Sequence, residues 1–390
     1  MTEKIAKPQL RFAGFDDTWE QRKLVEVATE MVAGGDIDKD LILDEGRYPV
    51  IANALTNDGI VGYYNEDYRI KAPAVTITGR GDVGHAKARI VHFTPVVRLL
   101  SLKSNHDVFF LENAINTLKI VIESTGVPQL TVPQLAKYEI SFPKSLDEEE
   151  KIGAYFKHLD NLITLHQRKY DKLTNVKKSM LEKMFPKNGS NVPEIRFKGF
   201  SDAWEQRKLG DVADLVGGGT PSTQNPEYWD GDIDWYAPAE IANQIYVKTS
   251  QRKITEQGYD NSSAKLLPPG TVLFTSRAGI GKTAILARKG CTNQGFQSIV
   301  PHKNELDTYF IFSRTEELKR YGELVGAGST FVEVSGKQMA AMDLMLPSTI
   351  QEQQMIGVFF KHLDNLITLH QRELEKLKNL KKACLEKMFV

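Results

Sequence analysis

The sequence predicts an α+β protein in which two mixed α/β domains are joined by two long helices that form an antiparallel coiled coil, with an internal pseudo-two-fold repeat. Three observations predict this fold. Two motifs each occur twice, apolar residues at heptad spacing run through both copies of the second motif, and the remaining regions mix short β-type runs with turn residues. We therefore expect four segments, namely a first domain (1–147), a first helix (148–187), a second domain (188–347) and a second helix (348–390).

The repeat consists of an opening motif and a helix motif. Pro8–Leu24 and Pro193–Leu209 are identical at twelve of seventeen positions. The thirteen-residue helix motif FKHLDNLITLHQR stands unchanged at Phe156–Arg168 and at Phe360–Arg372. Identity of this length within one chain indicates duplication, although a duplication could also serve only to enlarge a scaffold.

The helix motifs lie in two segments that have the pattern of a coiled coil. Ser145 precedes Glu148 by three residues and Thr349 precedes Glu352 in the same way, so each segment begins with a predicted capping box. At 1.5 Å per residue, roughly 38 residues form a helix about 57 Å long. The seam residues predicted from the 4–3 spacing are Ile152, Phe156, Leu159, Ile163, His166, Tyr170, Leu173, Met180 and Met184, and then Ile356, Phe360, Leu363, Ile367, His370, Leu374, Leu377, Cys384 and Met388.

His166 and His370 occupy equivalent positions on this seam. A metal-binding pair is one interpretation. A histidine pair without neighbouring cysteine or carboxylate ligands is more often packed and hydrogen-bonded, so we favour packing.

The composition restricts the class of protein. Fifty basic and fifty acidic residues give a net charge of zero, and both variable regions hold slightly more acidic than basic residues. Because a nucleic-acid-binding protein should show excess positive charge, composition by itself disfavours that function. Two cysteines are too few for a disulfide framework, and we find neither a signal peptide nor an apolar stretch of about 18 residues. These features predict a cytoplasmic protein that does not enter a membrane.

Each variable region contains a glycine-rich turn after a predicted strand. The turns Thr78–His85 and Thr275–Lys282 both fit Thr-x-Arg-x-x-(Val/Ile)-Gly-(His/Lys). A nucleotide-phosphate loop is disfavoured because the Walker pattern requires glycine where Ser276 stands. A structural β-turn and a loop that presents its two basic residues to phosphates and base edges both stay open. We favour the DNA-contacting loop because both copies keep the basic pair.

A second shared element precedes each long helix. Thr131 and Gln134 recur as Ser335 and Gln338 at the same offset as the helices. Such polar side chains suit the readout of base edges, but Thr131 and Ser335 would equally suit an N-cap, which is the interpretation we favour. The candidate DNA-contacting residues are Thr78, Arg80, His85, Lys87, Thr131, Gln134, Thr275, Arg277, Lys282, Ser335, Lys337 and Gln338.

No catalytic motif is recognisable in the sequence. We find no Gly-x-Ser-x-Gly, no metal-spaced cysteine and histidine cluster, no P-loop, and no run of the kind that amino-methyltransferases place beside the target base. The expected role is therefore to bind and position, while partner proteins perform the chemistry.

The order of repeated and variable segments resembles that of the specificity (S) subunits of type I restriction–modification enzymes. The resemblance covers essentially the whole chain. The matching text is WEQRKL at Trp19–Leu24 and Trp204–Leu209, GGTPS at Gly218–Ser222, YWDGDIDW at Tyr228–Trp235, VLFTSR at Val272–Arg277, NQG at Asn293–Gly295 and EQQMIG at Glu352–Gly357. The first helix opens with EEEKIG instead, a departure that matters little to capping.

The resemblance implies two target-recognition domains that each read one half of a bipartite site on double-stranded DNA. It implies a non-catalytic subunit that binds two methyltransferase (M) subunits through its helices and joins restriction (R) subunits in the full enzyme. S-adenosylmethionine, ATP and Mg²⁺ are then expected in the partner subunits, and no cofactor in this one. Helices of this length suggest half-sites on the order of 10–15 base pairs apart. The alternative is a coiled-coil scaffold whose duplicated domains bind protein or glycan.

Overall fold

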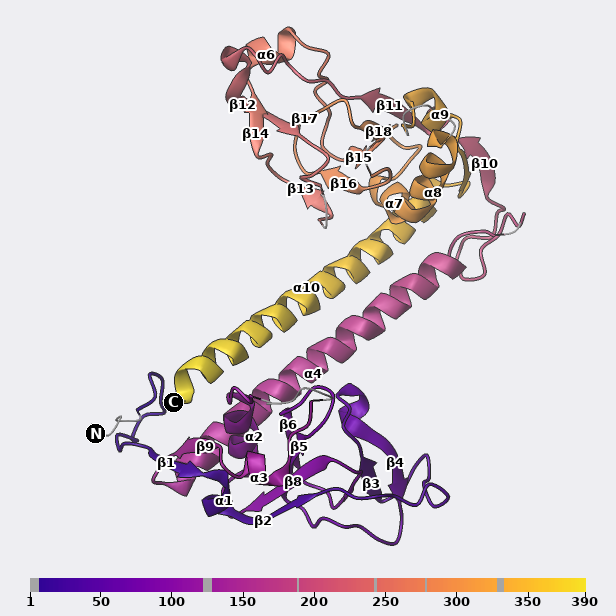
Figure 1. The fold of residues 1–390 in the computed structure, drawn as a ribbon. Helices are drawn as coiled ribbons and strands as arrows, with labels where there is room; N and C mark the ends of the chain where they lie inside the picture. Colours follow the sequence, from indigo (N-terminus) through magenta and orange to yellow (C-terminus); the bar gives the residue numbers. More distant parts are fainter. Residues whose placement is uncertain (1–6, 122–127, 188, 242–243, 278, 328–332) are drawn as a thin grey trace. The chain divides into compact units, whose positions relative to one another are not determined.

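The computed structural model describes residues 7–121, 128–187, 189–241, 244–277, 279–327 and 333–390. The chain forms two compact units, the first made of residues 1–168 and 370–390 and the second of residues 169–369. Each unit therefore combines a β-rich domain with the beginning of one long helix and the end of the other (Figure 1).

The first unit follows the opening motif with strands and short helices. Its elements are β1 (Glu20–Lys23), α1 (Leu24–Val27), β2 (Ala28–Ala33), β3 (Tyr48–Ile51), the 3-10 helix η1 (Thr56–Gly59), β4 (Ile60–Tyr64), β5 (Ala74–Thr78), β6 (Ala86–Arg89), β7 (Thr94–Pro95), β8 (Leu99–Ser104), α2 (Val108–Asn116), α3 (Val132–Leu135) and β9 (Glu139–Phe142). In the described part of this unit the strands form sheets in the orders β2-β8-β5-β6, β4-β3-β7 and β1-β9.

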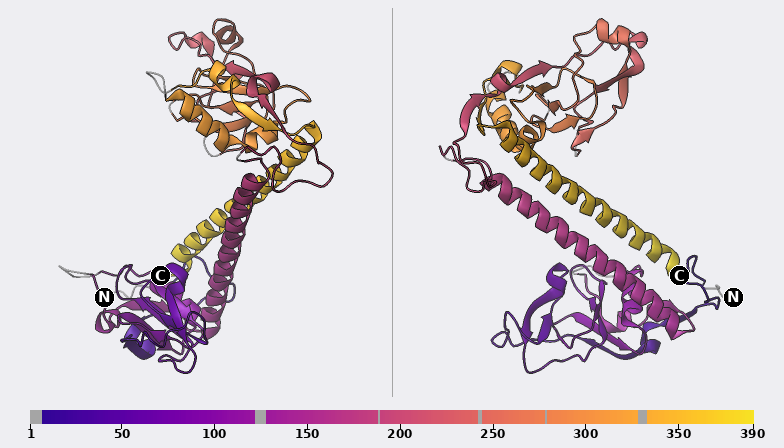
Figure 2. Two further views of the ribbon diagram at one scale, coloured as in Figure 1. Left: turned by 90° about the vertical axis from the view of Figure 1, so that its right-hand side faces the viewer. Right: turned by 180° about the vertical axis from the view of Figure 1, so that it is seen from behind.

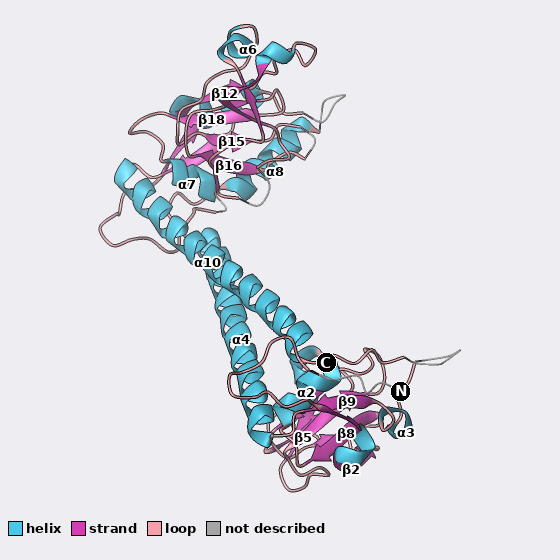
Figure 3. Ribbon diagram, turned by 90° about the vertical axis from the view of Figure 1, so that its left-hand side faces the viewer, coloured by secondary structure: helices cyan, strands magenta, loops and turns pink. Residues whose placement is uncertain are grey.

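The second unit repeats this plan with additions. Its elements are β10 (Glu205–Lys208), α5 (Leu209–Val212), β11 (Ala213–Gly217), the 3-10 helix η2 (Pro226–Tyr228), β12 (Trp229–Tyr236), β13 (Tyr246–Val247), β14 (Arg252–Ile254), α6 (Glu256–Asp260), β15 (Val272–Phe274), β16 (Thr283–Leu286), β17 (Cys291–Thr292), β18 (Gln297–Pro301), α7 (Thr308–Ser313), α8 (Thr315–Gly326), α9 (Gly336–Ala340) and β19 (Asp343–Leu346). Among the described residues its sheets have the orders β11-β18-β15-β16-β13, β14-β12-β17 and β10-β19. Within each unit the strands lie together with short helices (Figure 3).

The two long helices are α4 (Leu146–Lys183) and α10 (Ile350–Met388). Both run unbroken in every view (Figure 2). Within the first unit, Lys381 Nζ contacts Asp160 Oδ1 at 2.6 Å, and the two imidazoles lie closer to the unit boundary, with Nδ1 of His370 3.1 Å from Nδ1 of His166. The contacts show that the helices run antiparallel there, and the histidine pair is packed and hydrogen-bonded as predicted. Within the described ranges, no helix is both long and apolar enough to cross a membrane.

The ends of the predicted seam do more than pack helix on helix. In the first unit, Phe389 near the end of α10 contacts Trp19, Phe110 and Phe156, at ring-centroid distances of 6.2, 5.5 and 5.7 Å. In the second unit, Phe185 just after α4 contacts the equivalent rings of Trp204, Phe310 and Phe360, at ring-centroid distances of 5.9, 5.5 and 6.0 Å. Each domain core is thus completed by the C-terminal end of the long helix that starts in the other domain. Removing this aromatic surface from water lowers the free energy of the folded chain.

The predicted capping boxes are only half correct. The hydroxyl of Thr349 does accept a hydrogen bond from the backbone N–H of Glu352 at 3.4 Å. The carboxylate of Glu352, however, is fully buried and accepts two hydrogen bonds from Arg196, at 2.7 and 2.8 Å. In the first unit Glu148 binds Arg11 in the same way, at 2.6 and 2.8 Å. The arginine that both opening motifs share therefore anchors each motif to the first turn of a long helix.

Candidate nucleic-acid interface

The loop between β5 and β6 is closed by Thr78. The Thr78 hydroxyl donates to the carbonyl of Asp82 and accepts from the backbone N–H of His85 at 2.9 Å. Thr78 is only 5% exposed, so its hydroxyl is occupied inside the loop. The hydroxyl of Thr78 therefore holds the loop in shape, and its contact with DNA stays a prediction.

The loop between β15 and β16 has the same construction. Thr275 is fully buried, donates to the carbonyl of Gly279 at 2.8 Å and accepts from the backbone N–H of Lys282 at 2.9 Å. The hydroxyl of Thr275 thus shapes its turn in the same way, and its contact with DNA stays a prediction. The structural interpretation of the motif is correct for its threonine, which shapes the turn. The arginine of each turn is exposed or half-buried, so the DNA-contacting interpretation stays open for it.

The glycine that both turns share is required by the backbone. Gly84 and Gly281 have φ angles of 91° and 95°, in the left-handed region that side chains disfavour. An added Cβ would lie 2.6 Å from Cδ1 of Ile120 at the first position and 2.3 Å from Cγ of Lys319 at the second. The glycine of the motif is therefore explained by its backbone conformation and by local packing.

The basic residues of the turns differ in accessibility and charge. Arg80 and Lys282 are exposed, and Arg277 is half-buried. Burial lowers the pKa of His85 below its ordinary value, so its imidazole is neutral at pH 7. His85 is itself exposed, so the first turn presents an arginine with a neutral imidazole, where the second presents an arginine with a lysine.

The second shared element lies directly against the first. The backbone N–H of Leu130 donates to the carbonyl of Gly79 at 2.9 Å, and the N–H of Val334 donates to the carbonyl of Ser276 at 2.9 Å. Tertiary structure thus places two motifs that are about 50 residues apart side by side in each unit. We call this surface the rim. It consists of the loop after β5 and the start of α3 in the first unit, and of the loop after β15 and the start of α9 in the second.

Thr131 and Ser335 are N-caps, as favoured from the sequence. Thr131 caps α3 and Ser335 caps α9, each within a capping box. Oε1 of Gln134 and of Gln338 lies 2.9 Å from the backbone N of the capping residue. These four side chains form the capping-box hydrogen bonds, so contact between them and a base would require those hydrogen bonds to break. Lys337 on α9 is exposed.

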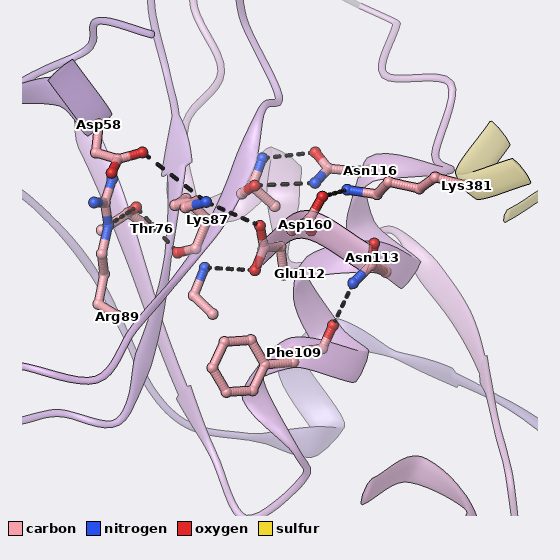
Figure 4. A network of polar contacts seen from close by, with 12 residues as sticks. Asp58, Thr76, Lys87, Arg89, Phe109, Glu112, Asn113, Asn116, Asp160 and Lys381 are labelled. Atoms are coloured by element: carbon pink, nitrogen blue, oxygen red, sulfur yellow. Dashed lines mark hydrogen bonds and ion pairs between the residues drawn. The ribbon is translucent and has the colours of Figure 1, made fainter. Parts of the chain in front are cut away.

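Lys87 does not belong to this rim of free basic groups. Its ammonium lies 3.8 Å from Glu112 and 3.9 Å from Asp58, in a polar network that also includes Arg89 (Figure 4). Burial raises the pKa of Glu112, and Lys87 opposes that shift. Lys87 was predicted to contact DNA, and in this structure its partly exposed ammonium lies within ion-pair distance of two carboxylates.

A third loop completes the rim and was not predicted. In the first unit it is residues 96–98, after β7, and in the second it is residues 293–295, after β17. The only sequence signal for it was the short NQG match in the second copy, because the first copy has a different sequence there.

A family model described as the type I restriction modification DNA specificity domain matches residues 16–175 and 201–379. The chain belongs to this family. Each specificity-domain match contains one complete rim, together with most of the long helix that follows it. The family resemblance noted in the motifs is confirmed, and so is the α+β fold with its internal repeat.

Relatives of this specificity-domain protein carry names of the same kind. The type I restriction enzyme MjaIX specificity subunit of Methanocaldococcus jannaschii is 35% identical over 190 residues, 48% of this chain and 44% of the relative. The EcoR124I/EcoR124II specificity subunit of Escherichia coli is 28% identical over 174 residues, 42% of each chain. The matched part of this chain spans about half the length of these curated relatives. The crystal structure of a type I restriction–modification S subunit from M. genitalium shares the fold, with a TM-score of 0.68 at 14% identity over 98% of this chain and 99% of that one.

Proposed function

We propose that this chain is the DNA sequence-specificity subunit of a type I restriction–modification assembly, and that each unit reads one half of a bipartite site. The observation that carries the proposal is the paired rim. Both units hold an arginine loop, a capped short helix and a third loop, and in both the same backbone hydrogen bond joins the arginine loop to the segment before the short helix. Exposed side chains of the two units differ, as at His85 and Lys282. Two domains with a common backbone arrangement but different exposed side chains are suited to bind two different DNA sequences.

The proposal includes partners and a division of labour. Two M subunits dock on the long helices and R subunits join the complete assembly, which acts in the cytoplasm. This chain supplies no catalytic group and no cofactor. S-adenosylmethionine, ATP and Mg²⁺ belong to the partners. The half-site separation of about 10–15 base pairs stays a prediction.

The neutral charge of the chain leads to a test of this assignment. Because phosphate neutralisation drives DNA affinity, a chain with no net positive charge should bind DNA weakly by itself and tightly with M. We expect methylome sequencing of a host that expresses the chain with its methyltransferase to show one bipartite motif. Equal DNA affinity with and without M would contradict the charge argument, and methylation without a bipartite motif would contradict the assignment.

The arginine loops should act on separate half-sites. Replacing the exposed Arg80 by alanine removes a side chain suited to guanine or phosphate, and should weaken binding by about 1–3 kcal/mol. Arg277→Ala should have a similar effect. Binding titrations of the M complex on DNA with one half-site randomised will assign each loss to one half. The matched controls, Lys39→Ala and Lys265→Ala, replace exposed lysines outside the loops and should change little.

A further inference from the structure

The third loop is tied to the arginine loop in both units. In the first unit, the backbone N–H of Gly79 donates to Oδ1 of Asn53 at 2.8 Å, and Nδ2 of Asn53 donates to the carbonyl of Val97 at 3.1 Å. In the second unit, the backbone N–H of Ser276 donates directly to the carbonyl of Gly295 at 2.8 Å. The third loop therefore has a fixed place beside Arg80 in one unit and beside Arg277 in the other.

The backbones of the two third loops are equivalent. Each loop follows a short strand that pairs in parallel with the central strand of a three-stranded sheet, β7 with β3 and β17 with β12. The backbone of each loop lies close to a glycine. An added Cβ on Gly34 would lie 2.1 Å from the carbonyl oxygen of Val96, and one on Gly218 would lie 1.9 Å from that of Asn293. These matched contacts make the next residues, Val97 and Gln294, equivalent positions.

The side chains at these two positions differ in chemistry. Val97 is 47% exposed and carries an apolar side chain. Gln294 is exposed, and the hydroxyl of Thr220 donates to its Oε1. That hydrogen bond orients the amide, so the two N–H donors and the second lone pair of the oxygen are left for another partner.

We infer that positions 97 and 294 are specificity-determining residues, which read one base in the first and one base in the second half-site. An exposed aliphatic group beside an arginine suits the C5-methyl group of thymine. An oriented glutamine amide suits the N6 and N7 edge of adenine, with which it can form two hydrogen bonds. This inference rests on the proposed function and adds which residue meets which class of base.

The test exchanges the two side chains in the full chain, co-expressed with its methyltransferase subunit, and compares the methylated motifs. Val97→Gln should change one position of the first half-site, and Gln294→Val one position of the second, with the other half-site and the spacing unchanged. The preference for the original base at that position should fall on the order of 10- to 100-fold. Val97→Ala, which removes only the branched methyl groups, should relax that preference without creating a new one.

Control variants separate base reading from general damage. Val91→Gln and Gln257→Val make the same exchanges at exposed positions outside the rim, and should leave the motif unchanged. An unchanged motif in the exchange variants, or a uniform loss of methylation over all sites while thermal unfolding is unchanged, would overturn the inference and leave the proposed function intact. A wild-type complex without a bipartite motif would instead overturn the proposed function itself.

Discussion

Replacing Glu352 by alanine is expected to lower the free energy of unfolding of the second unit by about 3–5 kcal/mol, because it leaves a desolvated guanidinium without its carboxylate. The Arg196 side chain is 11% exposed and that of Glu352 is 1% exposed. Two charge-assisted hydrogen bonds join them, and Arg196 also donates to the carbonyl of Asp202 at 2.7 Å. Equilibrium unfolding in guanidinium chloride, followed by tryptophan fluorescence, measures the change, since Trp204 lies in the core of this unit.

A surface glutamate on α10, in the part of the helix that belongs to the first unit, provides the control for a glutamate without a buried partner. Glu373 pairs with Lys376 at 3.9 Å, and both side chains are well exposed. Glu373→Ala should therefore change the free energy of unfolding by less than about 1 kcal/mol. Similar losses for Glu352→Ala and Glu373→Ala would show that the buried pair has no special role. Glu148→Ala should reproduce the large loss in the first unit, where Arg11 is the partner.

Removing residues 384–390 is expected to unfold the first domain selectively. The deletion takes Met388, which is 3% exposed, and Phe389 with its contacts to Trp19, Phe110 and Phe156, out of that domain's core. The lost burial is worth on the order of 4–8 kcal/mol, which is comparable with the whole stability of a domain. Limited proteolysis should then cleave the first domain while the second stays resistant, and methylation should lose dependence on the first half-site.

Deleting only Val390 is the control for this truncation, because that residue is 58% exposed. Its loss should change the free energy of unfolding by less than about 0.5 kcal/mol and leave the methylated motif unchanged. A truncated chain that keeps a protease-resistant first domain would show that the end of α10 is dispensable for that core.

The long helices, expected at 148–187 and 348–390 and found at Leu146–Lys183 and Ile350–Met388, could be predicted to within a few residues because their signals are local. Sustained 4–3 spacing placed them, and α4 and α10 have 38 and 39 residues. The N-caps at Thr131 and Ser335 were also predictable, since a cap depends on residues three positions apart. The strand before each arginine turn was predictable from its β-branched residues.

The composition of the rim could be predicted only in part. Arg80 and Arg277 were selected from a repeated pattern, and their turns do lie beside the capped helices. Thr78, Thr275 and Lys87 were assigned to DNA because residue type does not reveal which polar groups are already used. Their partners, which include backbone groups of the turn and a carboxylate on α2, become visible only when the chain is folded.

The amino-acid sequence by itself determined the duplication, the two long helices, the family and the position of the arginine turns, because each depends on identity or periodicity within a short window. Only the tertiary structure decided that Glu148 and Glu352 bind opening-motif arginines, that each core takes in the end of the other long helix, and that a third loop borders each rim. Those contacts join residues from about 20 to 370 positions apart, and no local pattern in the chain specifies which distant partner will fill a buried site.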